Sequence, residues 1–356
     1  MDTFCVLPWF GKEINWNQRE TSCCLLPAEH DIEEIKKDML AGVRSTACQK
    51  CWNLEDNKLQ SDRQLKNAAL DWYWDRDIEL IKQDAINSQN DVLMLKLNTS
   101  FTCNATCVSC NPSASSAWYQ LDAKIQNIIP IKKYKFIDLD QVNQKIDFSK
   151  LKTLSLLGGE PLYEKKNFDL LEHMLNLGNN TVFLSIVTNG SVVLTSRQKK
   201  ILSQFKNLNF SLSIDGIDRV FEYLRFPLKW NLLQENLQFF REVTDNISAN
   251  YTLSNLNIMY HNQTTAWFTQ NNIPFANNPI YTPAWLQPRT LPAASKKHLE
   301  TILSQQDYDM YIGQHSVEDD EKFQQCILNI QQQDRAKNIN IKDYLPEFCE
   351  MTNWPG

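Results

Sequence analysis

The strongest constraint on the fold is an alternation of apolar, strand-like runs with helix-like runs, which extends from Val92 to about residue 282. Strand, helix and strand repeated in this order favour parallel pairing through right-handed crossovers. About six such units predict an incomplete α/β barrel with its active-site loops after the carboxyl ends of the strands. The expected strands are VLMLKLNTS, TLSLLGG, VFLSIVTNG, FSLSIDG, NYTLSNLNIMY and a weaker run near Pro279–Tyr281. The expected helices are Ser113–Asn127, Phe168–Leu177, Thr195–Phe205, Leu228–Val243 and Thr264–Gln270.

The segments on either side of this alternation differ from it in composition and in hydrophobic pattern. Short stretches rich in Cys, Pro and Trp precede it, with one helix expected near Asp31–Leu40 and a polar helical stretch at about Asp62–Asn87. The C-terminal part is helical in pattern. Four regions are therefore expected: a small cysteine-rich domain at 1–62, a helical connector at 63–91, the partial barrel at 92–290 and a helical extension at 291–356.

The C-terminal extension contains one clear apolar face. Phe323, Cys326, Ile327 and Ile330 recur at helical spacing, which predicts a helix that packs back on the barrel. Cys326 is accordingly interpreted as a core residue, and Cys349 near the end of the chain has no clearer role than packing.

Composition narrows the class of function. The chain has 36 basic and 42 acidic residues and a formal net charge of -6, which disfavours nucleic acid as a partner. No secretory signal opens the sequence and no run approaches the roughly 20 apolar residues of a membrane-spanning helix, so a cytoplasmic protein without a membrane partner is expected. Ten cysteines in that compartment favour metal ligation over disulfides.

Three of these cysteines follow the first expected strand directly. Cys103, Cys107 and Cys110 form a C-x3-C-x2-C loop at the carboxyl end of that strand, where barrel proteins place their chemistry. Three thiolates on one short loop can bind three corners of an iron-sulfur cubane and leave the fourth iron open. When the loop is considered without the rest of the sequence, a zinc knuckle is the alternative interpretation.

Each of the next three expected strands also ends in a short motif. Gly158-Gly159-Glu160-Pro161 follows the second strand, Thr188-Asn189-Gly190 the third, and Ser213-Ile214-Asp215-Gly216 the fourth, with Arg225 shortly after. In this order the segments resemble the cluster loop, the GGEP motif, the TNG segment and the SxDG segment of the radical S-adenosylmethionine (SAM) superfamily.

The resemblance implies a partial (β/α)6 TIM-like barrel that binds SAM and a 4Fe-4S cluster. Cys103, Cys107 and Cys110 would be the catalytic cluster ligands, and the open iron would chelate the amino and carboxylate groups of SAM. The remaining contacts to SAM would come from Gly158, Gly159, Glu160, Pro161, Thr188, Asn189, Ser213, Asp215 and Arg225. One departure concerns the adenine ring, because Ser109 stands where the family usually has an aromatic residue.

A second group of cysteines lies near the N-terminus. It consists of Cys5, Cys23, Cys24, Cys48 and Cys51, and so many thiols in a short stretch of an expected cytoplasmic protein suggest metal ligation. The segment resembles a twitch domain, the shortened SPASM auxiliary-cluster domain, which implies a second iron-sulfur cluster of the 4Fe-4S type. Its ligands would be Cys5, Cys48, Cys51 and one of Cys23 and Cys24. Structural zinc is the alternative for four cysteines.

For function, the resemblance implies reductive cleavage of SAM to a 5′-deoxyadenosyl radical, which abstracts hydrogen from a substrate carbon. The expected partners are a substrate peptide or small molecule and a reductase such as flavodoxin or ferredoxin. Modification of a peptide or protein side chain or of a small metabolite is the leading interpretation. The alternatives are dehydrogenation of a sugar or cyclitol alcohol, and a catalytically degenerate iron-sulfur scaffold protein.

Overall fold

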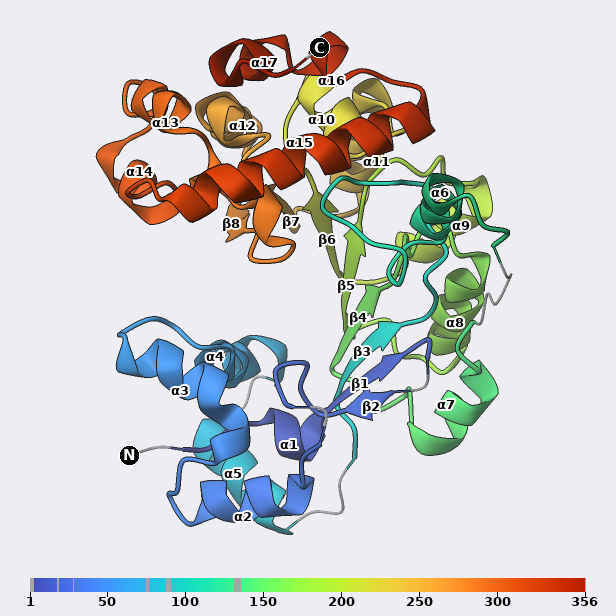
Figure 1. The fold of residues 1–356 in the computed structure, drawn as a ribbon. Coiled ribbons are helices and arrows are strands. Elements are labelled where there is room, and N and C mark those ends of the chain that lie inside the picture. The colour runs from blue at the N-terminus through green and yellow to red at the C-terminus, as the bar shows by residue number, and fades with distance from the viewer. Residues whose placement is uncertain are drawn as a thin grey trace. The chain divides into compact units, whose positions relative to one another are not determined.

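The computed structural model describes residues 3–17, 19–27, 29–74, 77–87, 91–130 and 136–355 of the chain. It divides into two compact units, each treated separately below (Figure 1). The first unit contains Met1–Ser100, Lys135–Ile186 and Thr195–Leu208, and the second contains Phe101–Tyr134, Val187–Leu194 and Asn209–Gly356. Among the described residues, no helix has the length and apolar character needed to cross a membrane.

The strands follow one another in the order β2-β1-β3-β4-β5-β6-β7-β8. Their bounds are Gly11–Asn15 (β1), Glu20–Thr21 (β2), Met94–Asn98 (β3), Thr153–Leu157 (β4), Phe183–Thr188 (β5), Asn207–Ser213 (β6), Ile247–Leu253 (β7) and Phe275–Pro279 (β8). β1 and β2 pair antiparallel, whereas β1–β3, β3–β4, β4–β5, β6–β7 and β7–β8 pair parallel. The expected α/β class with a largely parallel sheet is confirmed.

Helices connect the strands and cover them. In the first unit they are Leu7–Phe10 (α1), Ile32–Leu40 (α2), Gln49–Asp56 (α3), Asp62–Trp74 (α4), Ile78–Asn87 (α5), Leu139–Lys145 (α7), Lys165–Asn176 (α8) and Ser196–Leu202 (α9). In the second unit they are Ser116–Gln126 (α6), Asp218–Leu224 (α10), Trp230–Val243 (α11), His261–Gln270 (α12), Ala293–Leu299 (α13), Gln305–Tyr311 (α14), Val317–Lys337 (α15), Ile341–Tyr344 (α16) and Pro346–Thr352 (α17).

Several elements differ from the sequence-based prediction. The strand β1 was not expected, because GKEIN has a single strongly apolar residue and so shows no strand periodicity. The last strand, β8, is Phe275–Pro279 and was expected later, near Pro279–Tyr281, because FANNP lacks apolar alternation. The helices α7 and α10, of seven residues each, were not expected. The expected connector contains two helices, α4 and α5, and residues 75 and 76 between them lie outside the described part of the chain.

The two faces of the sheet have opposite character. In the first unit Leu97, Leu156 and Ile186 are buried in register on neighbouring strands. Lys96, Ser155 and Ser185 occupy the other face of the same strands and remain partly exposed. In the second unit Ser211 pairs with Ser248 and Ser213 with Asn250, all four partly exposed. This alternation differs from that of most parallel sheets, whose strands are apolar on both faces.

The long helix α15 runs across the second unit (Figure 1). Its expected apolar face is confirmed, because Phe323, Cys326, Ile327 and Ile330 are all buried. At the N-terminal end Lys296 Nζ lies 3.1 Å from Asp319 Oδ2, with side chains only 3% and 7% exposed.

We predict that Lys296→Met destabilises the folded protein, because the carboxylate of Asp319 would stay buried without its cation. Breaking a buried ion pair from one side typically costs about 3–5 kcal/mol. Urea unfolding should therefore show a clear fall in midpoint. Lys297→Met removes the same charge from the exposed neighbouring position and should leave the midpoint near that of the wild type. Equal midpoints for both variants would contradict the prediction.

Candidate functional site

The loop that carries Cys103, Cys107 and Cys110 belongs to the second unit and is held in a ladder with the segment after α10. The backbone N–H of Thr106 donates to the carbonyl oxygen of Phe226 at 2.7 Å, and that of Val108 donates to the carbonyl oxygen of Leu224 at 2.8 Å. The Thr106 hydroxyl donates to the same Phe226 oxygen at 3.1 Å. Arg225 stands between these two acceptors, so the ladder places it beside the loop.

The start of α6 holds the other side of the loop. The Ser116 hydroxyl accepts from the backbone N–H of Cys103 at 3.0 Å and donates to the Cys103 carbonyl oxygen at 3.3 Å. The indole Nε1–H of Trp118 donates to the carbonyl oxygen of Cys107 at 2.6 Å. The N–H of Cys110 donates to that same oxygen at 3.0 Å. Protein contacts from α6 therefore shape the backbone of the cysteine loop.

Arg225 is a charged group that lies beside the sulfur of Cys107. Its Nη1 lies 3.9 Å from Cys107 Sγ, and its Nη2 lies 2.9 Å from Asp215 Oδ2, with the two charged side chains 10% and 4% exposed. Burial raises the pKa of the Cys107 thiol to about 12, and the charge of Arg225 opposes that rise. The Nε–H of Arg225 is buried and has no acceptor. An anionic group at this point would satisfy it.

Asp215 positions Arg225. Its Oδ1 accepts from the backbone N–H of Thr252 at 3.0 Å, and its carbonyl oxygen accepts from Asn257 Nδ2 at 2.7 Å. Sequence reasoning assigned both Asp215 and Arg225 to SAM binding; the structure places them in direct contact with each other. Ser213, two residues earlier at the end of β6, is partly exposed on the polar face of the sheet.

The TNG segment is tied to the cysteine loop by an amide network that the sequence analysis missed. Asn189 Nδ2 donates to Asn104 Oδ1 at 2.8 Å, and Asn104 Nδ2 donates to the Ser191 hydroxyl at 3.0 Å. Asn189 Oδ1 in turn accepts from the Ser191 hydroxyl at 2.7 Å. The Thr188 hydroxyl accepts from the N–H of Gly190. Asn104 lies between two of the cysteines, and this position is the sequence feature from which its role in the loop could have been predicted.

The GGEP segment lies in the first unit, against the end of β3. The N–H of Gly159 donates to the carbonyl oxygen of Ser100 at 3.0 Å. Gly158 has φ +145°, and a Cβ there would lie 2.5 Å from that oxygen, so only glycine fits. Glu160 is buried and accepts from the N–H of Leu162 at 3.0 Å, while the Pro161 carbonyl oxygen accepts from Asn167 Nδ2 at 2.9 Å.

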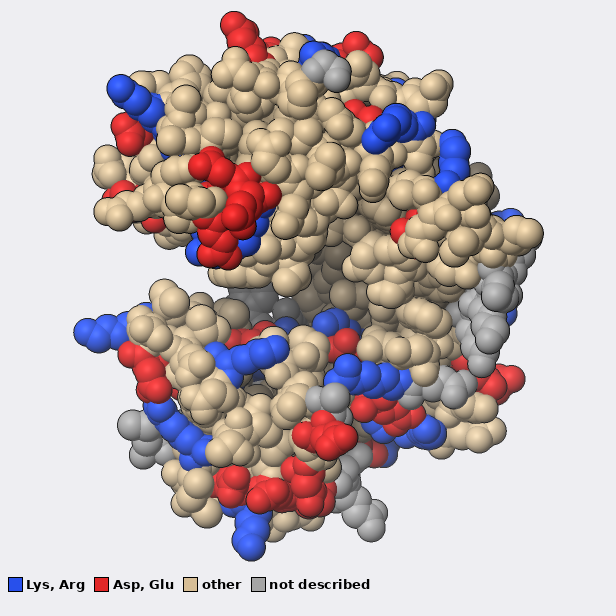
Figure 2. Space-filling view, in the orientation of Figure 1, with Lys and Arg blue, Asp and Glu red and all other residues tan. Residues whose placement is uncertain are grey.

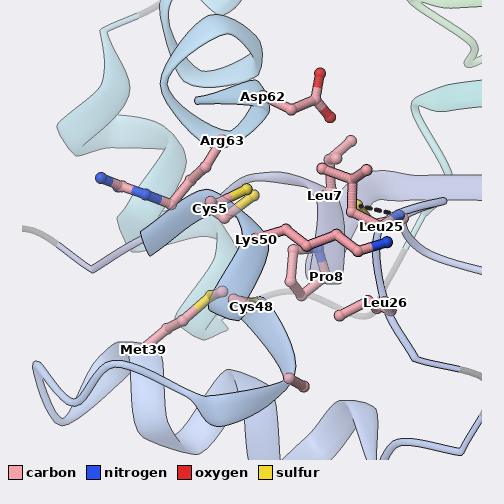
Figure 3. A pocket seen from close by; sticks show the side chains of 13 residues that line it. Cys5, Leu7, Pro8, Leu25, Leu26, Met39, Cys48, Lys50, Asp62 and Arg63 are labelled. Carbon is pink, nitrogen blue, oxygen red and sulfur yellow. Dashed lines mark hydrogen bonds between the residues drawn. The ribbon is translucent and has the colours of Figure 1, made fainter. Parts of the chain in front are cut away.

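The N-terminal cysteines line a pocket in the first unit (Figure 3). Cys5, Cys23, Cys48 and Cys51 surround about 440 Å³ of space free of protein atoms, part of it open to solvent. Cys24 is exposed and is not part of the lining. The other lining residues are Leu7, Pro8, Leu25, Leu26, Met39, Ala47, Lys50, Asp62 and Arg63.

A backbone amide and the charge of a nearby guanidinium act on the sulfur atoms of this pocket. The N–H of Leu25 donates to Cys23 Sγ at 3.4 Å. Burial raises the pKa of Cys5 to about 12 and that of Cys48 to about 11, and the Arg63 charge opposes both shifts. In the metal-free chain these thiols are therefore protonated at neutral pH, and metal binding must release their protons. Arg63 itself is held by Glu55, with Nη2 to Oε2 at 2.8 Å.

The two groups of cysteines can be compared with sites for a single metal ion and with sites for an iron-sulfur cluster. In the part of the chain that the structure describes, no three His, Cys, Asp or Glu side chains gather as ligands of one metal ion. Thiolates on a tetrahedral zinc stand only about 3.8 Å apart, given the zinc–sulfur bond length, whereas cubane ligands stand farther apart. At the loop, three cysteines and the unpaired Nε–H of Arg225 beside Cys107 fit the chemistry of an iron-sulfur cluster, and in the N-terminal pocket the N–H of Leu25 donates to Cys23 Sγ.

Comparison with known proteins identifies the class. Residues 97–265 match the Radical SAM superfamily, and this span contains the cysteine loop, GGEP, TNG, SIDG and Arg225. This span of the chain is a radical SAM domain. No curated protein matches the chain.

Several solved structures resemble the chain at low sequence identity. Native anSMEcpe with bound AdoMet is 18% identical, covers 52% of this chain and 52% of its own, and has a TM-score of 0.38. Streptococcus suis SuiB bound to precursor peptide SuiA is 16% identical, with coverages of 79% and 61% and a TM-score of 0.43. SuiB bound to S-adenosylmethionine is also 16% identical, with coverages of 83% and 65% and a TM-score of 0.39. The chain thus spans between about half and two thirds of these proteins.

We predict that Gly158→Ala destabilises the first unit more than Gly178→Ala. Both glycines have positive φ, +145° and +79°, but a Cβ at Gly178 meets nothing within 4 Å. Gly178→Ala should cost about 1–2 kcal/mol from the backbone conformation alone, and Gly158→Ala should exceed it because of the overlap with the Ser100 oxygen. Denaturant unfolding of both variants measures the difference, and equal losses would contradict the account of the GGEP turn.

Proposed function

We propose that this chain binds SAM at a 4Fe-4S cluster held by Cys103, Cys107 and Cys110, and modifies a substrate by hydrogen abstraction. The observation that carries the proposal is the buried contact of Arg225 with Cys107 and Asp215 inside the radical SAM domain. The bound cluster and SAM would supply an electron and the 5′-deoxyadenosyl radical that removes the hydrogen atom.

The residues around the loop would bind and orient SAM. The unpaired Nε–H of Arg225 would donate to the SAM carboxylate, while Asp215 keeps the guanidinium in place. The Asn104–Asn189 contact would hold the TNG segment against the loop. Thr188 and Ser213 would complete these contacts in the second unit.

We further propose that Cys5, Cys23, Cys48 and Cys51 hold a second, auxiliary 4Fe-4S cluster. Their arrangement around one pocket supports this, as does the N–H of Leu25 that points to Cys23 Sγ. Four protein ligands would leave no open iron, so this cluster would serve electron transfer or architecture. The expected electron donor to the enzyme is flavodoxin or ferredoxin.

For the substrate we propose a polar molecule, either a peptide or protein side chain or a small metabolite. The polar, partly exposed sheet face supports this: Ser211, Ser248 and Asn250 offer hydroxyl and amide groups where a filled barrel would have branched apolar side chains. On the face drawn in Figure 2, basic side chains stand among acidic ones and form no extended basic surface among the described residues.

The central activity can be tested directly. Anaerobically reconstituted wild type should bind about eight iron atoms, as two clusters require, and should form 5′-deoxyadenosine from SAM when reduced with dithionite. The variant with Cys103→Ala, Cys107→Ala and Cys110→Ala should keep about four iron atoms and form none. The iron that remains in the auxiliary site shows that the variant is folded. Undiminished 5′-deoxyadenosine formation by the triple variant would eliminate the proposal.

The choice between Cys23 and Cys24 gives a second test. Because Cys23 lines the pocket and Cys24 is exposed, Cys23→Ser should lower the content by about four iron atoms, whereas Cys24→Ser should keep the wild-type content. The cluster content of both variants is measured by iron and sulfide analysis, together with the absorbance near 400 nm that is typical of such clusters. The opposite ranking would show that Cys24 is the ligand.

A further inference from the structure

Lys337, the last residue of α15, reaches the cysteine loop from the C-terminal extension. Its Nζ donates to the carbonyl oxygen of Thr106 at 3.0 Å and to Gln333 Oε1 at 3.2 Å. The ammonium also lies 5.8 Å from the ring centroid of Trp118 and 5.9 Å from that of Phe226. A single side chain therefore contacts the loop, the helix that follows it and the segment that pairs with it.

These contacts hold two consecutive peptide groups of the loop. The carbonyl oxygen of Thr106 accepts from Lys337, and the carbonyl oxygen of Cys107 accepts from the Trp118 indole beneath the ammonium. On the opposite side the N–H of Thr106 is bound to Phe226. The backbone that presents Cys107 is thus fixed from both sides, and Lys337 supplies one of the contacts.

The position of Lys337 is set by a helix with little freedom to move. The preceding turn of α15 contains Asp334, whose Oδ1 accepts from the Tyr223 hydroxyl at 3.0 Å and whose Oδ2 accepts from the N–H of Ile341 at 2.8 Å. The far end of α15 is held by the ion pair between Lys296 and Asp319.

The charge of Lys337 has no carboxylate partner within ion-pair distance among the described residues. Burial lowers the pKa of Lys337 to about 8, and nearby Cys107 and Asp334 oppose that shift, so the ammonium is mostly charged at neutral pH. A half-buried cation that is bound by carbonyl groups and aromatic faces is stabilised when an anion lies near. Arg225, the other cation at the loop, is already paired with Asp215.

We propose that Lys337 is a positioning residue of the SAM-binding cluster, which it stabilises by holding the Thr106–Cys107 backbone and by balancing the cluster's negative charge. The inference rests on the proposed function. A cubane with three thiolates is anionic and gains one more negative charge when it accepts one electron, with no bond formed or broken. A fixed cation beside it favours the reduced state and therefore raises the midpoint potential of the cluster.

The test compares variants by redox titration followed by electron paramagnetic resonance, using the signal that responds to added SAM. Lys337→Met should lower the midpoint potential of this cluster, and Lys337→Arg should restore it. Lys337→Gln keeps a donor for Thr106 but no charge, so it should also lower the potential even if Lys337→Met does not fold. Lys322→Met removes a charge from the same helix at a distance of about 22 Å, as the helical rise per residue implies. Its midpoint potential should match that of the wild type.

A second readout is the loss of iron to a chelator from the oxidised protein. Lys337→Met should release iron from the SAM-binding cluster about 10-fold faster than the wild type, as expected for loss of a supporting contact around metal ligands. Unchanged potential and unchanged release in both Lys337→Met and Lys337→Gln would overturn the proposal for Lys337 alone. A wild type that assembles no SAM-responsive cluster would overturn the proposed function, and this proposal with it.

Discussion

The buried contact of Arg225 with Asp215 and with the sulfur of Cys107 is the interaction on which the site depends. It joins the cysteine loop to the end of β6, because Asp215 is itself fixed by the backbone of Thr252. It also places one positive charge beside a thiol whose pKa burial raises to about 12. A thiolate at this position requires such a charge or a metal, and the free Nε–H of Arg225 leaves a place for one more anion.

The second unit builds the rest of the site from elements far apart in the sequence. α6 provides Ser116 and Trp118, the TNG segment provides Asn189, and α15 provides Lys337. Each of these side chains binds the backbone or an amide of the loop, and none of these contacts requires a sulfur atom. These contacts restrict the backbone conformation of the loop.

How much of this could be predicted from sequence depends on how local each signal is. The loop from Cys103 to Cys110 and the glycine turn at Gly158 are local patterns, and the parallel strands that precede them have clear apolar periodicity. β1 was missed because its pairing with β3 comes from tertiary contact rather than from its own composition. Lys337 could not be recognised, since its partner Thr106 lies 231 residues away and a lysine at a helix end is usually solvated.

The central claim is that the loop holds a site-differentiated cluster whose open iron binds SAM. Mössbauer spectroscopy of the iron-57-enriched protein with and without SAM tests this most directly, because it resolves the coordination of individual iron sites. The account predicts that added SAM changes the isomer shift of about one iron in eight, the open site of one of two cubanes. A spectrum that SAM leaves unchanged, in a protein shown to contain both clusters, would contradict the account.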